Sequence, residues 1–321
     1  MTYLLAIIAT AAYQRAFGDV TGAGMLLLFG PRWWLLLPWT VLGVVSAVSS
    51  WRLVVIALVG VLITLVGVTE FELPLRWPVS PDRHALRVVT YNTDRSPELA
   101  WRIRGDLAEW GADVVLLQDC KTVVADSLTA IAATTTGLTV HSTPEFCFVS
   151  RLPVESVELM PSLVRPGTRG VGRFGNVARY RVRTAQGVLP VYSLHLESPR
   201  DALWAARGLN FAQLRQSILV RGADSHLAAE WVSRGDSALV VGGDFNLSTG
   251  SAILRRDWGD LSDAFAVAGF GFGNTMFAGR FAVRIDHVLV SRALVVERVA
   301  LLRDYPSEHQ PVVVDLGWRG R

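Results

Sequence analysis

The chain of 321 residues is unusually apolar: 51% of its residues are hydrophobic and only 18% are charged, whereas globular chains carry about 25% charged residues. The scarcity of charge is confined to residues 1–69, which contain only four charged side chains. These are Arg15, Asp19, Arg32 and Arg52. This uneven distribution excludes a disordered chain and a soluble secreted chain with a simple cleavable leader. It predicts a membrane segment at residues 1–73 followed by a globular domain.

Two apolar stretches within the membrane segment predict a tight helical hairpin. Residues 33–49 and 53–69 are each an uncharged run of seventeen residues, and a membrane span requires about 17–25 residues. Four tryptophans would anchor the hairpin at the membrane surface, namely Trp33, Trp34, Trp39 and Trp51. Residues 1–30 could add a third, imperfect span or an interfacial helix. The alternative is a hairpin buried in a soluble core.

The arginines around the hairpin bear on its orientation. Five of them lie outside its two ends, namely Arg15, Arg32, Arg76, Arg83 and Arg87, whereas Arg52 alone lies at its turn. Because basic residues are enriched on the cytoplasmic side of membrane proteins, the pattern slightly favours a multi-pass protein with a cytoplasmic globular domain.

A proline-rich linker at residues 74–84 precedes the expected globular domain at residues 85–321. The expected helices run from a cap at Ser96, through Pro97, to Gly111, over Ala202–Val220 and over Leu227–Ser233. The expected strands are Leu86–Tyr91, Asp113–Leu117, Phe146–Ser150, Val177–Val182, Val188–Leu194, Ala238–Val241, Ile285–Ser291 and Val312–Leu316. Many strands with a few helices indicate a mixed α/β sandwich.

The charge and the cysteines of the globular domain limit its function classes. From Val88 onward there are 25 basic and 24 acidic residues. Proteins that grip long stretches of duplex usually carry a strong basic excess, so extended nucleic-acid binding is not favoured. The two cysteines, Cys120 and Cys147, are too few for a disulfide scaffold, although they allow one bridge.

Polar residues gather where the expected strands end, as side chains that build a site on a sheet often do. The six places are Asn92-Thr93-Asp94, Gln118-Asp119, His195, Asp244 with Asn246, Asp286-His287 and Glu308-His309. Their carboxylates and amides suit a hard divalent cation with oxygen ligands, not zinc held by Cys and His. Taken singly, each has an ordinary alternative, because Asp and Asn after a strand usually serve a turn and a lone His is usually structural.

The order of these segments resembles the signature of the endonuclease/exonuclease/phosphatase superfamily, which includes DNase I-like nucleases, inositol-phosphate phosphatases and bacterial sphingomyelinases. The resemblance covers residues of about 86–318. Its most specific elements are Gly243-Asp244-Phe245-Asn246, Ile285-Asp286 and Ser307-Glu308-His309. It implies a four-layer α/β/β/α sandwich of the DNase I type, with the active site at one edge of the paired sheets.

The resemblance also implies a metal site for Mg²⁺ or Mn²⁺. Asn92 and Asp119 would hold the ion with help from Glu308. Asp94 matches an acid that some members of the superfamily use at the same metal.

Five further residues would carry the chemistry implied by the resemblance. Asp244 and Asn246 would position or activate the attacking water. Asp286 would orient His309, which would be the general base or the cation that polarises the phosphate. His195 would contact the scissile phosphate from the opposite side.

Two positions depart from the pattern of the superfamily, which normally has Glu where Asp119 stands and Asp where Glu308 stands. One acid is shortened and the other lengthened, so the metal could sit displaced between them. Arg200 and Arg173 are candidates for binding a substrate phosphate, although Arg200 could instead cap the helix that follows it. His287 is expected to be structural.

These observations predict a membrane-anchored, divalent-metal-dependent phosphoesterase that acts on nucleic acid, a phospholipid headgroup or a small phosphodiester. The membrane is the other expected partner, reached through the N-terminal helices, and no protein partner is expected. The alternative is a membrane-bound binding module of the same fold in which the altered acids abolish the chemistry. Retention of Asp244, Asn246, Asp286 and His309 weighs against that alternative.

Overall fold

The computed structural model describes residues 2–74, 86–161, 163–164, 173–174, 177–235, 237–279 and 281–319, with the backbone alone at 163–164 and 173–174. The expected linker at residues 74–84 therefore lies outside the described residues, apart from Pro74.

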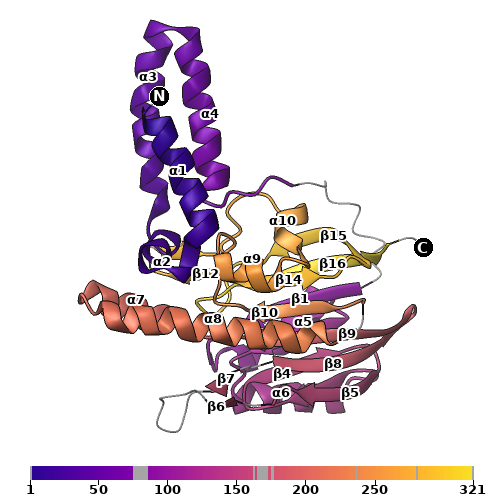
Figure 1. Cartoon of the computed structure of the whole chain (residues 1–321). Coiled ribbons are helices and arrows are strands. Elements are labelled where there is room, and N and C mark those ends of the chain that lie inside the picture. The colour runs from indigo at the N-terminus through magenta and orange to yellow at the C-terminus, as the bar shows by residue number, and fades with distance from the viewer. Residues whose placement is uncertain are drawn as a thin grey trace.

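Two six-stranded sheets form the centre of the globular part (Figure 1). The first has the order β15 (Leu294–Leu301), β16 (Val312–Trp318), β1 (Leu86–Asn92), β2 (Val114–Gln118), β4 (Phe146–Ser150) and β3 (Thr139–Ser142). The second has the order β11 (Ser262–Asp263), β14 (Asp286–Val290), β10 (Val240–Asp244), β9 (Gly187–His195), β8 (Val177–Thr184) and β5 (Val154–Leu159). Both sheets are mixed: β1 with β2, and β9 with β10, are parallel, whereas the other pairs are antiparallel.

The sheets pack face to face, and helices cover their outer faces. Between the sheets, the ring of Phe148 on β4 stacks on that of Tyr180 on β8, with centroids 3.8 Å apart. The helices α5 (Leu99–Trp110) and α6 (Thr122–Ala133) share an apolar cluster with the first sheet. The helices α8 (Phe211–Ser233) and α9 (Ala252–Trp258) share one with the second. The predicted four-layer DNase I-like sandwich is therefore confirmed.

The eight expected strands are all present, with ends displaced by at most three residues. The fold also contains β3, β5, β15 and the short pairs β6 (Leu163–Val164) with β7 (Arg173–Phe174) and β12 (Met276–Ala278) with β13 (Phe281–Val283). A short helix, α10 (Ala264–Ala268), precedes β12.

Two helix predictions were wrong in detail. Ser96 does not cap α5, because its hydroxyl donates to the Glu98 carboxylate and the helix begins at Leu99. Gly111 does end this helix, in the left-handed conformation expected for it, with φ 55°.

The long helical stretch after residue 200 is divided at a different place from the one predicted. The helix α7 (Arg200–Arg207) ends before Leu209, which has φ 63°, and the side chain of Asn210 then caps α8 by accepting from the Gln213 amide. From there α8 continues without a break to Ser233.

The N-terminal segment forms a helical bundle that projects from the sandwich (Figure 1). It consists of α1 (Thr2–Phe17), α2 (Gly22–Leu28), α3 (Leu37–Ser49) and α4 (Trp51–Gly67), with short 3-10 turns at Gly18–Val20 and Arg32–Leu36. The indole of Trp39 on α3 donates to Thr64 Oγ1 on α4 over 2.8 Å. Gly60 allows this close approach, because a Cβ at that position would lie 2.1 Å from the Trp39 ring.

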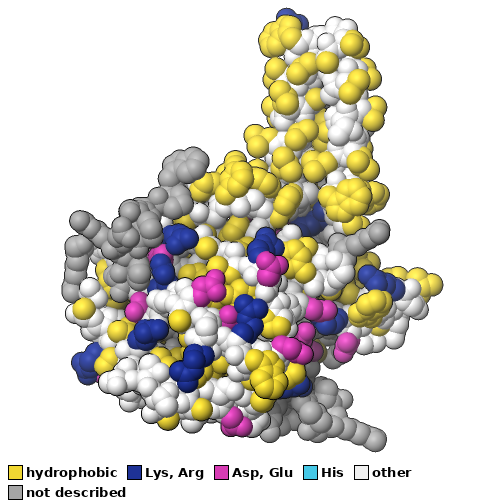
Figure 2. Space-filling view, turned by 180° about the vertical axis from the view of Figure 1, so that it is seen from behind, with side chains coloured by type: hydrophobic (Ala, Val, Ile, Leu, Met, Phe, Trp, Pro, Cys, Tyr) yellow, Lys and Arg dark blue, Asp and Glu magenta, His cyan; other side chains and the backbone are white. Residues whose placement is uncertain are grey.

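The outer surface of the bundle is almost entirely apolar (Figure 2). Val44, Val48 and Trp51 are 71%, 87% and 73% exposed. Among the described residues, Arg32–Ser49 is the one helical segment long and apolar enough to cross a membrane, with 18 residues, whereas Trp51–Gly67 is shorter. The prediction of two or three spans is corrected to one candidate, Arg32–Ser49: α4 and α1, with 17 and 16 residues, are both shorter than its 18.

Cys120 and Cys147 form the one disulfide that the sequence allows, with their Cα atoms 5.7 Å apart. Cys120 lies two residues after the end of β2, and Cys147 lies in the neighbouring strand β4 opposite Leu117. The bridge therefore joins two strands of the first sheet at one edge.

Candidate active site

Strand register places the expected site residues at one edge of the sandwich. Asn92 ends β1 beside Gln118, which ends the parallel strand β2. In the second sheet, Asp244 ends β10 beside His195, which ends the parallel strand β9. The first residue of β14, Asp286, pairs with Asp244 from the other side. Because the carboxyl ends of parallel strands meet at the same edge, residues far apart in the sequence converge there.

Asp244 lies at the centre of this cluster and is 2% exposed. Its Oδ2 accepts a hydrogen bond of 2.9 Å from Asn92 Nδ2, which joins the two sheets, and its Oδ1 accepts one of 2.8 Å from the Asn246 amide. Burial raises the pKa of Asp244, and the charge of Asp286 raises it further against the opposing effect of the two nearby imidazoles. A raised pKa makes this carboxylate a stronger base.

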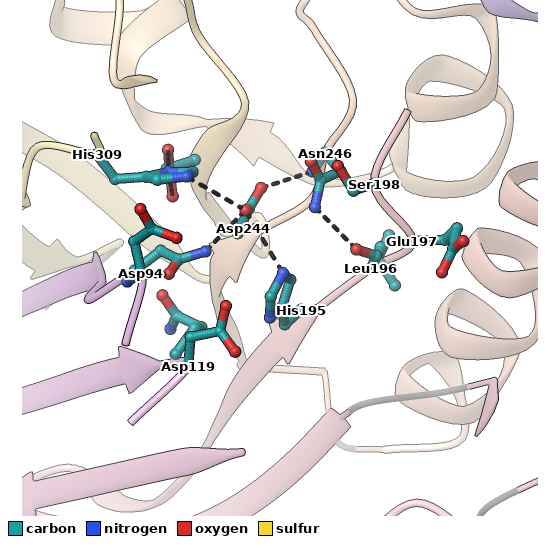
Figure 3. A network of polar contacts seen from close by, with 12 residues as sticks. Asp94, Asp119, His195, Leu196, Glu197, Ser198, Asp244, Asn246 and His309 are labelled. Atoms are coloured by element: carbon teal, nitrogen blue, oxygen red, sulfur yellow. Dashed lines mark hydrogen bonds and ion pairs between the residues drawn. The ribbon is translucent and has the colours of Figure 1, made fainter. Parts of the chain in front are cut away.

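Two imidazoles, those of His195 and His309, face Asp244 (Figure 3). Each is also paired with another carboxylate. His309 Nδ1 donates to Asp286 over 2.8 Å, and its Nε2 lies 3.9 Å from Asp244 Oδ2. His195 Nδ1 donates to Glu145 over 2.5 Å, and its Nε2 lies 3.7 Å from the same oxygen. The Nδ1 contacts therefore fix both rings with Nε2 toward one point.

The same carboxylates set the charge of the two rings. Burial disfavours the charged form of His195, but Glu145 and Asp244 outweigh it and raise its pKa to about 9. Burial likewise opposes the charge of His309, and Asp286 together with Asp244 raises its pKa to about 9. Both imidazoles are thus cationic at neutral pH and can donate a proton.

The loop after β10 presents Asn246 in the left-handed conformation, with φ 51°. Its Nδ2 donates to the Leu196 carbonyl over 2.8 Å. His287 holds this loop in place, because its Nε2 donates to the Leu247 carbonyl over 2.9 Å and its Nδ1 contacts Asp263. The geometry agrees with a structural role for His287.

Asp119 lies at the half-buried rim of the site, with φ 50°. Its ligand oxygens lie within 4.8 Å of those of Glu145 and of the His195 ring. Arg95 contacts it from solvent, with Nε donating to Asp119 Oδ1 over 3.0 Å. Glu145 was not recognised in the sequence: it stands in a turn before β4, where an acid has an ordinary explanation.

The structure brings together two groups of side chains that could hold a metal ion. The group of Asp119, Glu145 and His195 fits a hard divalent cation better than the group of Asp244, Asp286 and His309 does. Asp119 and Glu145 supply oxygen ligands at a half-buried place. The second group, Asp244, Asp286 and His309, is fully buried and its members already bond to one another or to Asn92 and Asn246.

The structure does not bring Glu308 to the acids of this group. Its carboxylate forms an ion pair with Arg200, the first residue of α7. The Glu308 carbonyl accepts from the Phe277 amide of β12 over 2.8 Å, and His309 forms a β-bridge with Met276. Glu145 is thus the acid that the structure places beside Asp119, and the assignment of Glu308 to the metal stays a prediction.

The remaining candidates are placed as follows. Asp94 is exposed, and its backbone amide donates to Asn92 Oδ1 over 2.8 Å; Figure 3 shows its side chain on the same side of the site as Asp119. Arg200 stands at the rim through its pair with Glu308. Arg173 belongs to β7, and its side chain lies outside the described residues.

Comparison with known proteins identifies one matching family and several solved structures with a similar fold. The model of the Endonuclease/Exonuclease/phosphatase family matches residues 89–309. A humanized D. rerio TDP2 is 15% identical with a TM-score of 0.56, covering 72% of this chain and 98% of its own. The 3' phosphatase NExo from Neisseria, bound to a product DNA hairpin, is 18% identical with a TM-score of 0.52, covering 73% and 100%.

A third structure, an endonuclease/exonuclease/phosphatase from Beutenbergia cavernae, is 22% identical with a TM-score of 0.50 and covers 74% of this chain and 72% of its own. No curated protein matches the chain. At these identities the structural likeness establishes the fold alone.

Proposed function

The chain belongs to the endonuclease/exonuclease/phosphatase family, and we propose that it is a membrane-anchored, divalent-metal-dependent hydrolase of phosphate esters. The observation that carries this proposal is the pair of carboxylate-backed imidazoles, His195 and His309, on either side of the buried Asp244. One base and two acids around one point are what hydrolysis of a phosphate ester requires.

Each residue has a defined part in the reaction. Asp244 accepts a proton from the attacking water, whose oxygen forms a bond to phosphorus. His309, as an imidazolium held by Asp286, gives a proton to the ester oxygen as its bond to phosphorus breaks. His195 offers its Nε2–H to a phosphate oxygen and so offsets negative charge. Asn246, fixed by Leu196, orients the water or the phosphate.

Asn92 and Asp119 would hold Mg²⁺ or Mn²⁺, with Glu145 beside them. A bound ion would supply a positive charge that polarises the phosphate. Glu145 also keeps the His195 tautomer fixed, so one acid would link the ion site to the catalytic ring.

The competing proposal is a binding module without catalysis, which the ion pairs of Asp119 with Arg95 and of Glu308 with Arg200 favour. In that case arginines would replace the metal. Arg95 is largely exposed, with 69% of its side chain accessible, and such a surface pair is worth only about 0–1 kcal/mol. It would therefore yield readily to a divalent ion.

The test uses the full chain in detergent with bis(4-nitrophenyl) phosphate as substrate. Hydrolysis is expected with Mg²⁺ or Mn²⁺, to stop with EDTA, and to return when the ion is added back. His309→Ala should lower the rate by about 10²–10³-fold, as the loss of one charge-stabilising donor does. Mn²⁺ binding, followed by electron paramagnetic resonance, should weaken in Asp119→Ala. Neither binding nor hydrolysis by the unaltered chain would favour the binding module.

The substrate class within the proposal is a phosphate ester of nucleic acid, of a phospholipid headgroup or of a small diester. Two of the three structures named above are a TDP2 and a 3' phosphatase bound to a product DNA hairpin. The nearly neutral domain and the apolar bundle favour a substrate close to a membrane over long duplex DNA.

The apolar bundle supports the membrane anchor, with Arg32–Ser49 as the spanning candidate and the exposed side chains of α4 and α1 beside it. The distribution of arginines slightly favours a cytoplasmic catalytic domain, but the disulfide leads us to propose the opposite orientation. Cys120 and Cys147 form a disulfide. Disulfides persist in oxidising compartments and are rare in the cytosol of most organisms. The catalytic domain would thus lie outside the cytoplasm.

Thiol labelling in cells checks this orientation. Cells that express the full chain are quenched with acid, denatured and treated with maleimide-polyethylene glycol with or without prior reduction. We expect a shift in mass only after reduction, because both cysteines are oxidised. Labelling of both cysteines without reduction would instead place the domain in a reducing compartment.

A further inference from the structure

The loop 245–251 joins the catalytic Asp244 to α9, and two acids of the N-terminal segment bind it. One is Glu70, which follows α4, and the other is Asp19, which lies between α1 and α2. In the sequence these acids merely interrupt or end apolar runs. In the structure each accepts hydrogen bonds from the catalytic part of the chain.

Glu70 connects the loop to Arg32, at the start of the candidate membrane span Arg32–Ser49. Its Oε1 accepts from the Gly250 amide over 2.8 Å and from Ser248 Oγ over 3.2 Å. Arg32, the first residue of the spanning candidate, contacts the same oxygen at 2.7 Å. A Cβ at Gly250 would lie 2.3 Å from Glu70 Oε1, so this approach requires glycine.

Asp19 is completely buried, with 0% exposure, and holds the end of the same loop. Its Oδ2 accepts from Ser251 Oγ over 2.6 Å, and its Oδ1 accepts from the amides of Ala252 and Ile253 over 3.1 and 3.3 Å. A side chain from the N-terminal segment thus supports the start of α9.

Arg221 on α8 connects Asp19 to the site. Its NH2 donates to the Asn246 carbonyl over 2.7 Å and lies 3.5 Å from Asp19 Oδ2. Its side chain is 1% exposed. Removing the acid beside a buried guanidinium leaves a buried charge without its counter-ion, which is strongly unfavourable, so the Asp19 charge keeps Arg221 against the Asn246 backbone.

We propose that Asp19 is a positioning residue of the phosphoesterase site, which acts on Asn246 through Arg221 and makes the N-terminal segment a working part of the catalytic unit. This inference rests on the proposed function for its kinetic consequence. Its structural consequence, a loop 245–251 held in place from the membrane side, can be measured without any turnover.

The first experiment measures amide hydrogen exchange of the full chain in detergent. Asp19→Asn keeps the shape of the side chain and one acceptor oxygen, for Ser251 or for the amides of Ala252 and Ile253, and removes the charge that faces Arg221. Exchange in peptides that cover residues 244–251 should become faster. Asp126→Asn, at an exposed position on α6, is the matched control and should leave exchange there unchanged.

The second experiment measures hydrolysis of bis(4-nitrophenyl) phosphate. Asp19→Asn should lower kcat by about 10- to 100-fold with little change in KM, as small misplacements of a catalytic group do. In an Asn246→Ala background the same substitution should cause no further loss, because both act through one residue. A loss that adds fully to that of Asn246→Ala would indicate general destabilisation and overturn the proposal.

The outcomes separate the two proposals. If the unaltered chain does not hydrolyse the diester, the proposed function fails, whereas the exchange experiment still decides the role of Asp19. Unchanged exchange at residues 244–251 overturns that role whatever the activity. If Asp19→Asn does not fold, Asp19→Asn combined with Arg221→Gln removes both buried charges together, and its loop 245–251 should again exchange faster.

Discussion

Replacing Asp244 by asparagine is expected to lower kcat for a phosphodiester by about 10²–10⁴-fold, the usual contribution of a positioned general base. Asparagine preserves the volume but has a single acceptor oxygen, so it keeps one of the two hydrogen bonds that Asp244 accepts, from Asn92 or from the Asn246 amide. It cannot take a proton from water at neutral pH. The loss should therefore fall on kcat, while the fold and KM remain close to those of the unaltered chain.

The measurement compares steady-state kinetics of Asp244→Asn and of Asp126→Asn in detergent with saturating Mn²⁺. The control should match the unaltered chain, because Asp126 is exposed on α6 and is not one of the site residues. Circular dichroism spectra of all three proteins should coincide. Retention of kcat within a few-fold in Asp244→Asn would rule out this carboxylate as the base and leave the water to another group.

The sequence predicted most of this centre because strand ends are visible in it. Asn92, His195 and Asp244 each follow a β-rich run, and the carboxyl ends of parallel strands lie at a common edge. The pairing of Asp286 with His309 was implied by the resemblance and is present at 2.8 Å. Here local pattern and family signature describe the same geometry.

Sequence-based prediction failed for site residues whose interaction partner lies on a distant element, because no sequence pattern marks such a contact. Glu145 occupies a turn, and only folding brings it to His195, on the other sheet. Glu308 was assigned to the metal by the resemblance to the superfamily, whereas in the structure its carboxylate pairs with Arg200. Asp19 looked like an interruption in an apolar run, since nothing nearby in the sequence reveals its contact with Ser251.

The disulfide supplies the other large effect, on stability. Replacing Cys120 and Cys147 together by alanine should lower the free energy of unfolding by about 2–5 kcal/mol, as loss of a native disulfide does in small domains. The two residues are 27 positions apart, and closing a loop of that size is worth roughly 3.5 kcal/mol in the chain-entropy model. Both side chains are buried, so the double substitution avoids leaving reactive thiols in the core.

The same change should weaken the ion site, because Cys120 adjoins Asp119 and Cys147 lies two residues beyond Glu145. Urea unfolding in detergent measures the stability, and Mn²⁺ titration measures the affinity. Reduction of the unaltered chain is the matched control and should reproduce both losses, whereas the double variant should not respond to the reductant. If reduction leaves the unaltered chain as stable as before, the bridge neither stabilises the sheet nor holds the two acids together.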